Sequence, residues 1–403
     1  MRIRFIPFEK LPYSDTCWSL IEGPDDCVYA AACNEFAPGG TVFVLRYDPR
    51  TEQLDYLIDV AEAVGEPAAN GRATQCKIHY SMVVDDDGTM YGATHLSGPA
   101  VTEVKYNPWG TFDDPLRSYV GARVFAYDCG AEDVLWTDTL IPWEGCRCVA
   151  LDRERRRLYA VGYPRDHFYC FDIEKREGRD FGRIGSVNPQ AVWLDARGRA
   201  YTTDDYGRLV VFDPDQDRLI ETDIRAPHAS YQDGWHNVVY DVVQVPGSED
   251  VVGVAWNADP CLFRFSPGEE AGTGTMRSLG PASPGIDGWG LRGVNTDHAG
   301  GLVFTAGGDL LFGLSVSGEE AGLAGRGCVL KRMNIETGKM ENVCTVVDEN
   351  DVQIGYVSRA VRIGAEHLVL GIAGQLPTGI VHVVLDGELA EGPMAESPRR
   401  YWG

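Results

Sequence analysis

The stretch CKIHYSMVVDDDGTMYGATH, residues 76–95, carries a histidine near each of its ends. Two apolar runs flank the turn DDDGT, whose Asp and Gly residues suit a tight hairpin. An antiparallel hairpin places the start of its first strand beside the end of its second strand. His79 and His95 are therefore expected at the same end of one sheet, where two imidazoles can act on one ligand.

The unit around these histidines recurs along the chain. A short apolar strand that ends in Tyr or Phe and continues with small or polar residues appears as CVYAAACN, TMYGATH, RLYAVGYP, RAYTTDDY and LVFTAGG, with two divergent copies, DVVGVAWN and LVLGIAG. Another strand precedes each copy, and a third and a fourth strand follow most copies. This pattern predicts an all-β, seven-bladed β-propeller with four-stranded antiparallel blades. We expect a single domain, 1–403, with the N-terminal RIRFIPF completing the last blade and a short polar tail at about 387–403.

Blade geometry predicts which side chains meet His95. Alignment of the blades on their Tyr or Phe places these residues at equivalent positions around the mouth of the central channel: Cys33, His95, Tyr163, Asp205, Trp256, Gly308 and Gly374. The same face should receive the residues that precede each inner strand, together with Arg183: Arg147, Asn188, Asn237, Arg292 and Arg359. Two His, one Tyr and several Arg predict a site for a ligand that bears a carboxylate.

Composition narrows the partners. The 403 residues carry a net charge of −24, which disfavours a nucleic-acid or anionic-membrane partner through long-range repulsion. Eleven cysteines are scattered singly, as is typical of free thiols in a reducing compartment. The start lacks the apolar run of a signal peptide, and no later run is long enough to span a membrane. We expect a cytoplasmic protein, or a secreted one if a leader was trimmed from the sequence.

Blades two and three carry a resemblance to a known family. KIHYSMVVDDDGTMYGATH, followed by YAVGYPRDHFYCFD and DFGRIG, resembles the seven-bladed propeller polysaccharide lyases, which include ulvan lyases, rhamnose-glucuronate lyases and, more distantly, oligogalacturonate lyase. The resemblance implies cleavage of a uronate-containing oligosaccharide by β-elimination: the carboxylate is neutralised, the C5 proton is removed, and the 4-linked sugar departs. This chain differs by a long insert after His95, LSGPAVTEVKYNPWGTFDDPLRSYVGAR.

The resemblance also implies roles for particular residues. His79 and His95 would stand at the carboxylate or assist proton transfer, Tyr163 would be the base or the acid, and Arg183 would bind a carboxylate. Imidazolium and Arg would offset the carboxylate's charge, and Tyr163 beside His95 and Arg183 would have a lowered pKa. Further substrate contacts are expected from four residues: His236, Asn257, Arg292 and Arg359.

Other functions remain open at this point. A sugar lactonase or a metal-assisted lyase would need three or four converging ligands, and only the two histidines of blade two are placed together. The DDDG turn lacks the spaced oxygen ligands of a calcium loop, and the two thiols of CRC point to opposite faces of a strand. The cofactor is therefore unknown, and one divalent cation stays compatible with the sequence. A non-catalytic propeller that binds a ligand or a partner protein would use Trp235, Trp256 and Trp289.

Overall fold

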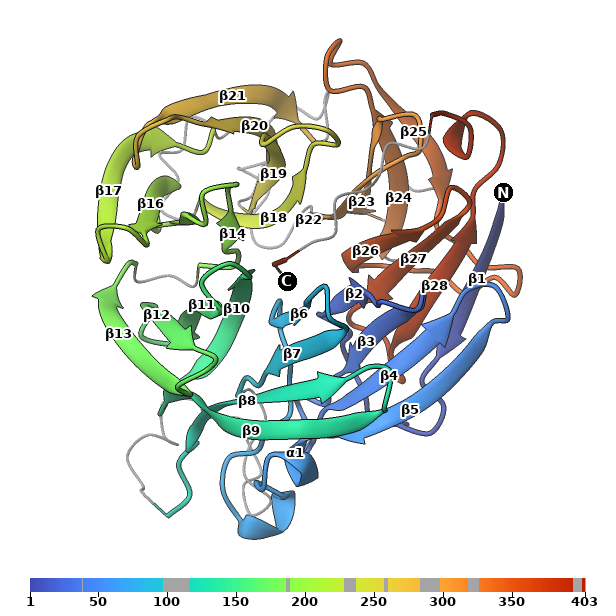
Figure 1. Ribbon diagram of the computed structural model, residues 1–403. Coiled ribbons are helices and arrows are strands. Elements are labelled where there is room, and N and C mark those ends of the chain that lie inside the picture. Colours follow the sequence, from blue (N-terminus) through green and yellow to red (C-terminus); the bar gives the residue numbers. More distant parts are fainter. Residues whose placement is uncertain are drawn as a thin grey trace. The chain divides into compact units, whose positions relative to one another are not determined.

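The computed structural model describes residues 1–37, 39–96, 116–185, 189–227, 237–256, 260–282, 298–317, 326–393 and 401–402. In these residues the strands form seven four-stranded antiparallel sheets (Figure 1). Each sheet is one blade, and the fold is the seven-bladed β-propeller that the repeats predict. The chain divides into two compact units.

The N-terminal unit comprises Pro7–Ser186, Ala373–Gly379 and Arg400–Gly403 and holds three blades. The first blade contains β2 (Leu20–Glu22), β3 (Val28–Ala32), β4 (Phe43–Asp48) and β5 (Gln53–Asp59), followed by the short helices α1 (Val60–Ala63) and η1 (Ala68–Asn70). The second contains β6 (Met82–Val84), β7 (Thr89–Ala93), β8 (Gly121–Asp128) and β9 (Asp133–Pro142). The third contains β10 (Gly145–Asp152), β11 (Arg157–Tyr163), β12 (His167–Asp172) and β13 (Glu177–Arg183).

The C-terminal unit comprises Met1–Ile6, Val187–Ile372 and Ile380–Arg399 and holds four blades. The fourth blade contains β14 (Trp193–Leu194), β15 (Ala200–Thr203), β16 (Arg208–Asp213) and β17 (Arg218–Arg225). The fifth contains β18 (Val238–Gln244), β19 (Val251–Trp256), β20 (Cys261–Pro267) and β21 (Gly274–Pro281). The sixth contains β22 (His298–Phe304), β23 (Leu310–Ser317), β24 (Arg326–Met333) and β25 (Met340–Thr345). The seventh contains β26 (Val357–Ile363), β27 (His367–Ile372), β28 (Gly379–Val384) and the N-terminal strand, with the short helix η4 (Gly387–Leu389) after β28.

The N-terminal strand β1 (Arg2–Pro7) completes the seventh blade. The strand order of this sheet is β1-β28-β27-β26, so the first residues of the chain pair with nearly the last strand. The Met1 ammonium forms an ion pair with Asp386, and the Ile3 carbonyl accepts a hydrogen bond from the Glu349 amide at 3.2 Å. The predicted closure of the last blade by RIRFIPF is therefore confirmed, and it covers an edge that would otherwise expose unpaired backbone groups.

The tyrosine of the sequence repeat has a structural role. Tyr29, Tyr159 and Tyr201 occupy the second strand of their blades and are almost completely buried. Each phenol donates a hydrogen bond to an Asp of the preceding hairpin turn or strand end. The pairs are Tyr29 with Asp25 at 3.5 Å, Tyr159 with Asp152 at 3.1 Å and Tyr201 with Asp195 at 2.9 Å. A buried phenol needs such a partner, so the repeat pairs a core aromatic ring with a turn carboxylate.

A small residue follows this position because the third strand needs the space. Gly92 pairs with Phe125 across β7 and β8, and a Cβ atom at Gly92 would lie 2.2 Å from the Phe125 ring. Gly253 and Phe263 repeat the arrangement across β19 and β20, with a Cβ–ring distance of 2.3 Å. Since no side chain fits at such distances, the glycines allow the aromatic rings to lie flat over the second strand.

The end of the chain packs against the third blade. The Leu151 amide donates a hydrogen bond to the Tyr401 carbonyl at 2.6 Å, and Ala150 and Trp402 form an antiparallel bridge. The Tyr401 phenol donates to Asp86 at 2.9 Å, and the Arg153 guanidinium lies 3.8 Å from the centre of the Tyr401 ring. These contacts extend the free edge of the inner strand β10.

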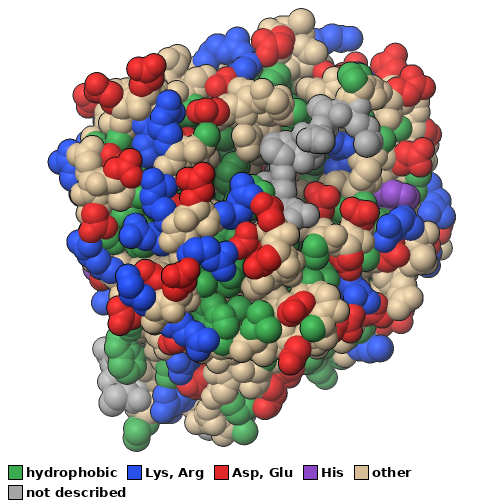
Figure 2. All heavy atoms as spheres, in the orientation of Figure 1, with side chains coloured by type: hydrophobic (Ala, Val, Ile, Leu, Met, Phe, Trp, Pro, Cys, Tyr) green, Lys and Arg blue, Asp and Glu red, His purple; other side chains and the backbone are tan. Residues whose placement is uncertain are grey.

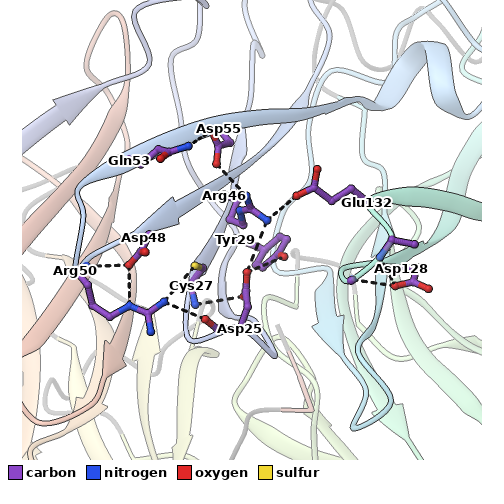
Figure 3. Close-up of polar contacts among 12 residues, drawn as sticks. Asp25, Cys27, Tyr29, Arg46, Asp48, Arg50, Gln53, Asp55, Asp128 and Glu132 are labelled. Atoms are coloured by element: carbon purple, nitrogen blue, oxygen red, sulfur yellow. Dashed lines mark hydrogen bonds and ion pairs between the residues drawn. The ribbon is translucent and has the colours of Figure 1, made fainter.

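A cluster that we call the turn network joins strands and hairpin turns of the first two blades. It consists of Arg46, Asp25, Asp55 and Glu132, and Figure 3 shows the Arg46 guanidinium among the three carboxylates. Guanidinium nitrogens of Arg46 lie 3.0 Å from a carboxylate oxygen of Asp55, 2.7 Å from one of Glu132 and 3.9 Å from one of Asp25. All four side chains are partly exposed, so water screens their charges.

The remaining features of the chain agree with its composition. All eleven cysteines lie within the described residues and are free thiols, ten of them buried. In the described part of the chain, no helix is long and apolar enough to cross a membrane. On the face drawn in Figure 2, Lys and Arg side chains lie among Asp and Glu side chains, so this face carries mixed charge.

Candidate active site

The ends of the second and third blades bring His79, His95 and Tyr163 together. The His95 amide donates a hydrogen bond to the Lys77 carbonyl at 2.7 Å, which closes the hairpin at the end that the sequence predicts. The ring centres of His79 and His95 are 6.1 Å apart, and those of His95 and Tyr163 are 5.1 Å apart. Gly145 permits this approach, because a Cβ atom there would lie only 3.0 Å from His95 Nδ1.

Around these three residues lies what we call the imidazole cluster. Its members all belong to the N-terminal unit. They lie in the third blade, in the segments before inner strands and in the segments after second strands: Trp18, Glu35, Lys77, His79, His95, Arg147 and Tyr163.

His79 is buried and packs against neighbouring aromatic rings. Its side chain is 2% exposed, and its Nδ1 atom lies 3.0 Å from the Arg147 carbonyl. The ring stacks on Trp18 with a centre-to-centre distance of 5.1 Å and meets the edge of Tyr80 at 4.1 Å. This packing fixes the ring and favours a positioning role for His79.

His95 has a different environment, since one ring nitrogen lacks a partner. Nδ1 donates a hydrogen bond to the Leu96 carbonyl, which leaves Nε2 as the unprotonated nitrogen of a neutral ring. Nε2 is buried and has no hydrogen-bond partner among the described residues. Burial, and then the nearby charges of Arg147 and Lys77, lower the pKa of His95 well below its usual range. His95 is thus a neutral hydrogen-bond acceptor and potential base.

The low pKa of His95 bears on the expected imidazolium charge. Imidazolium was expected to help offset the charge of a ligand carboxylate, but His95 cannot supply that charge while it stays neutral. Lys77 and Arg147, which are 4% and 8% exposed, bring positive charge to the cluster.

Lys77 belongs to a buried ion pair that the sequence analysis missed. Its Nζ atom lies 3.0 Å from a Glu35 oxygen and 4.9 Å from the centre of the Trp18 ring. Glu35 also accepts hydrogen bonds from the Thr16 hydroxyl at 2.7 Å and from the Trp18 indole. Burial alone would raise the pKa of Glu35, but Lys77 and these donors hold it below its usual range. No local sequence pattern indicates this pair, because Glu35 and Lys77 lie far apart in the chain.

Arg147, rather than Arg183, lies against Tyr163. The Arg147 guanidinium carbon is 4.8 Å from the centre of the Tyr163 ring. Tyr163 is partly buried and packs against Ala73, Leu96 and Tyr119. Arg183 is exposed at the end of β13, where its Nε donates to the Gly185 carbonyl at 2.6 Å. Blade geometry predicted Arg147 at the same face as His95 and Tyr163, but no individual role was predicted for it.

Glu144 supports the segment that carries Tyr163. Its buried carboxylate accepts hydrogen bonds from the Tyr169 phenol at 2.9 Å and the Arg165 amide at 3.1 Å, and it pairs with the Arg165 guanidinium at 2.8 Å. A Cβ atom at Gly162 would lie 2.6 Å from this carboxylate. Glu144 therefore anchors the residues that follow Tyr163 and packs closely against Gly162, which no sequence pattern indicated.

Of the four further substrate contacts that the sequence predicts, the structure describes one. Arg359 lies in the C-terminal unit, is 2% exposed and forms an ion pair with Asp241. Three predicted contacts, His236, Asn257 and Arg292, lie outside the described residues, as do Asn188, Trp235, Trp289 and the side chain of Trp256. The described residues contain no group of three or more His, Cys, Asp or Glu side chains placed to hold a metal ion.

Comparison with known proteins supports the fold alone. No protein family and no curated protein matches the sequence. A catalytically inactive variant of virginiamycin B lyase from Staphylococcus aureus, solved with quinupristin, aligns with a TM-score of 0.60 and 8% identity over 96% of this chain and 99% of that one. A protein from Bacteroides uniformis named as a 6-phosphogluconolactonase aligns with a TM-score of 0.50 and 14% identity over 83% of this chain and 84% of that one.

A third similar structure is longer than this chain. The extracellular domain of a one-component system from B. thetaiotaomicron aligns with a TM-score of 0.59 and 13% identity over 96% of this chain. The present chain spans 40% of that protein's length. Because these three proteins have different functions and low identity, the scaffold does not by itself define an activity.

Proposed function

We propose that this chain is a carbohydrate lyase that cleaves a uronate-containing oligosaccharide by β-elimination. The observation that carries the proposal is the buried Nε2 atom of His95, which is unprotonated, has no hydrogen-bond partner among the described residues and lies beside Tyr163. In our proposal this neutral nitrogen accepts a proton from a substrate carbon that reaches it.

The charges of the imidazole cluster favour an anionic substrate. Lys77 and Arg147 bring two positive charges and Glu35 brings one negative charge, so these three residues leave one positive charge in a buried region. The C5 proton of a uronate becomes removable when the adjacent carboxylate is neutralised by cations or hydrogen-bond donors. Arg147, which lies against Tyr163, is the cation that we assign to the substrate carboxylate.

The reaction then needs one base and one acid. In our proposal His95 Nε2 takes the C5 proton, the electrons of the C5–H bond form the C4=C5 double bond, and the C4–O bond breaks. The Tyr163 phenol gives its proton to the departing oxygen, and solvent later restores both protonation states. General acid–base help of this kind is worth roughly 10²- to 10⁴-fold in rate.

The remaining sequence predictions stay part of the proposal. Arg183, His236, Asn257, Arg292 and Arg359 are proposed to contact or position more distant parts of the substrate, Arg359 only through its neighbours because it is buried. A soluble uronate oligosaccharide in the cytoplasm is the proposed partner, without nucleic acid or membrane.

The test is the formation of a 4,5-unsaturated product. The protein is incubated with a panel of uronate-containing oligosaccharides, and the ultraviolet absorbance of the new double bond is followed with mass spectrometry of the products. His95→Gln should lower turnover roughly 10²-fold or more. His167→Gln is the matched control, since His167 pairs with Asp180 at 2.9 Å and lies outside the cluster. Absence of unsaturated product from every uronate, or full activity in His95→Gln, contradicts the proposal.

A second candidate is a non-catalytic propeller that binds a uronate. The burial of both imidazoles, His79 at 2% and His95 at 1% exposure, favours it, because a reactive base must meet its substrate. The same panel separates the two functions. Saturable binding by calorimetry without unsaturated product would support the binding protein.

A further inference from the structure

Three aromatic side chains of the C-terminal unit form a second cluster, which we call the aromatic triad. Tyr240 belongs to β18, His298 begins β22, and Tyr356 immediately precedes β26. The His298 ring stacks on Tyr356 with a centre-to-centre distance of 4.1 Å and meets the edge of Tyr240 at 4.1 Å. The two phenol oxygens are 2.6 Å apart and share a hydrogen bond. Residues 116 positions apart in the sequence are thus joined at three strand starts.

The sequence next to His298 is adapted to this packing. A Cβ atom at Gly300 would lie 3.3 Å from both His298 Nε2 and the Tyr240 ring. At Gly301, where φ is +69°, it would lie 2.8 Å from Val357. Two consecutive glycines therefore let β18 and β26 approach β22 closely enough for the three rings to meet.

A buried ion pair locks the same strands next to the aromatic triad. Arg359 of β26 pairs with Asp241 of β18, and the Asp241 carboxylate also accepts the Leu302 amide of β22 at 2.8 Å. Asp241 is fully buried and Arg359 is 2% exposed. The charges of this pair cancel, in contrast to the positive charge left on Lys77, Arg147 and Glu35.

One ring of the triad is accessible while the others are not. Tyr240 is 2% exposed and His298 is 6% exposed, whereas Tyr356 is partly exposed. The stacking, the shared hydrogen bond and the ion pair fix the orientation of an accessible phenol ring. A fixed aromatic ring with a polar edge is suited to hold an amphipathic ring, as sugars are.

We propose that Tyr356 is the contact residue of a subsite for a neutral sugar ring, with Tyr240 and His298 as positioning residues. The ligand class rests on the proposed carbohydrate function, and the neutral charge follows from the cancelled charges of Asp241 and Arg359. Both residues are buried and paired with each other, so they offer a ligand no ion pair, and the ligand that we propose is an uncharged sugar.

The experiment is a titration of the full chain with three neutral disaccharides, cellobiose, lactose and maltose. Nuclear magnetic resonance of protein labelled at its histidines follows the ring signals of His298, which touches Tyr356. At least one sugar should shift the His298 signals saturably and leave those of His95 unchanged. In Tyr356→Ala the affinity should fall roughly tenfold or more, while Tyr206→Ala, which removes an exposed tyrosine of the same unit, should bind normally.

Two results overturn the subsite: none of the three sugars shifts the His298 signals of the unaltered protein, or Tyr356→Ala binds as tightly as Tyr206→Ala. The first needs no variant, so it holds even if Tyr356→Ala folds poorly. Failure of the lyase assay does not affect this titration, because it measures binding without turnover. Formation of unsaturated product together with no neutral-sugar binding would overturn the subsite alone.

Discussion

The N-terminal unit holds two charged clusters that are built in opposite ways. In the turn network one arginine, Arg46, faces three carboxylates, and every member is partly exposed. In the imidazole cluster two cations, Lys77 and Arg147, accompany one carboxylate, Glu35, and all three are buried. Water and salt weaken the first set of interactions, whereas the second acts through a medium of low polarity.

The difference indicates which region can do chemistry. The turn carboxylates of Asp25 and Asp152 accept hydrogen bonds from backbone amides and tyrosine phenols. In the imidazole cluster His95 keeps a buried nitrogen without a partner among the described residues. An unsatisfied buried polar atom needs an explanation, and a catalytic role is one of the explanations. The comparison therefore predicts large mutational effects in one region and small ones in the other.

The largest expected effect follows loss of the Glu35 charge. Glu35→Gln leaves the Lys77 ammonium buried without its counter-charge, and removal of one partner from a buried pair destabilises proteins by about 3–5 kcal/mol. The measurement is the free energy of unfolding from urea titration.

The double variant Glu35→Gln, Lys77→Met is the control. It removes both charges and should recover most of the lost stability, because an apolar replacement of a buried pair is often neutral. Equal stability of Glu35→Gln and the unaltered protein would show that the pair is screened like the turn network.

The fold could be predicted from the sequence because its determinants are local and repeated. The tyrosine that aligned the blades marks a real register position, where Tyr29, Tyr159 and Tyr201 reach turn carboxylates. RIRFIPF was recognised as the closing strand because no other apolar segment remained to complete the last blade. These inferences need only strand periodicity and turn chemistry.

The site was predictable only in part, since side-chain environments depend on packing between blades. The adjacency of His95 and Tyr163 followed from blade alignment. The neutral state of His95 depends on its burial and on the nearby charges of Arg147 and Lys77. The sequence did not indicate that these two charges act on His95. Glu35 lies 42 positions before Lys77 in the chain, so their ion pair has no local pattern.

The second prediction concerns Tyr163. Tyr163→Phe keeps the ring against Ala73 and Tyr119 but removes the proposed proton donor. Turnover on a uronate substrate should fall roughly 10²-fold, while binding and the unfolding midpoint change little. Product absorbance and thermal unfolding are measured on the same sample. A tyrosine that served packing alone would instead give normal turnover in the folded fraction, and that outcome would rule out the assigned role.

The third prediction is a pH effect at the edge of the imidazole cluster. Burial, and then the Glu35 carboxylate, raise the pKa of Asp15 to about 6. Because this folded-state pKa exceeds the ordinary value of about 3.9, Asp15 contributes stability at low pH that is lost as the pH rises through about 6. Relative to Asp15→Asn, the unaltered protein should gain stability from about pH 7 to about pH 5.

The measurement for Asp15 is the free energy of unfolding of both proteins across this pH range. The comparison with Asp15→Asn cancels the titration of other groups that the two proteins share. Parallel pH profiles would show that Asp15 titrates normally and that its burial beside Glu35 has no electrostatic consequence.

The smallest expected effect lies in the turn network. Arg46→Met removes all three ion pairs of Figure 3, yet partly exposed pairs contribute about 1 kcal/mol or less. The difference in unfolding free energy between Arg46→Met and the unaltered protein should shrink further in about 1 M salt, where charges are screened within about 3 Å. The Glu35→Gln difference should persist in the same salt, because water does not reach that pair. If Arg46→Met lost as much unfolding free energy as Glu35→Gln, and the loss persisted in salt, the distinction between the two clusters would be wrong.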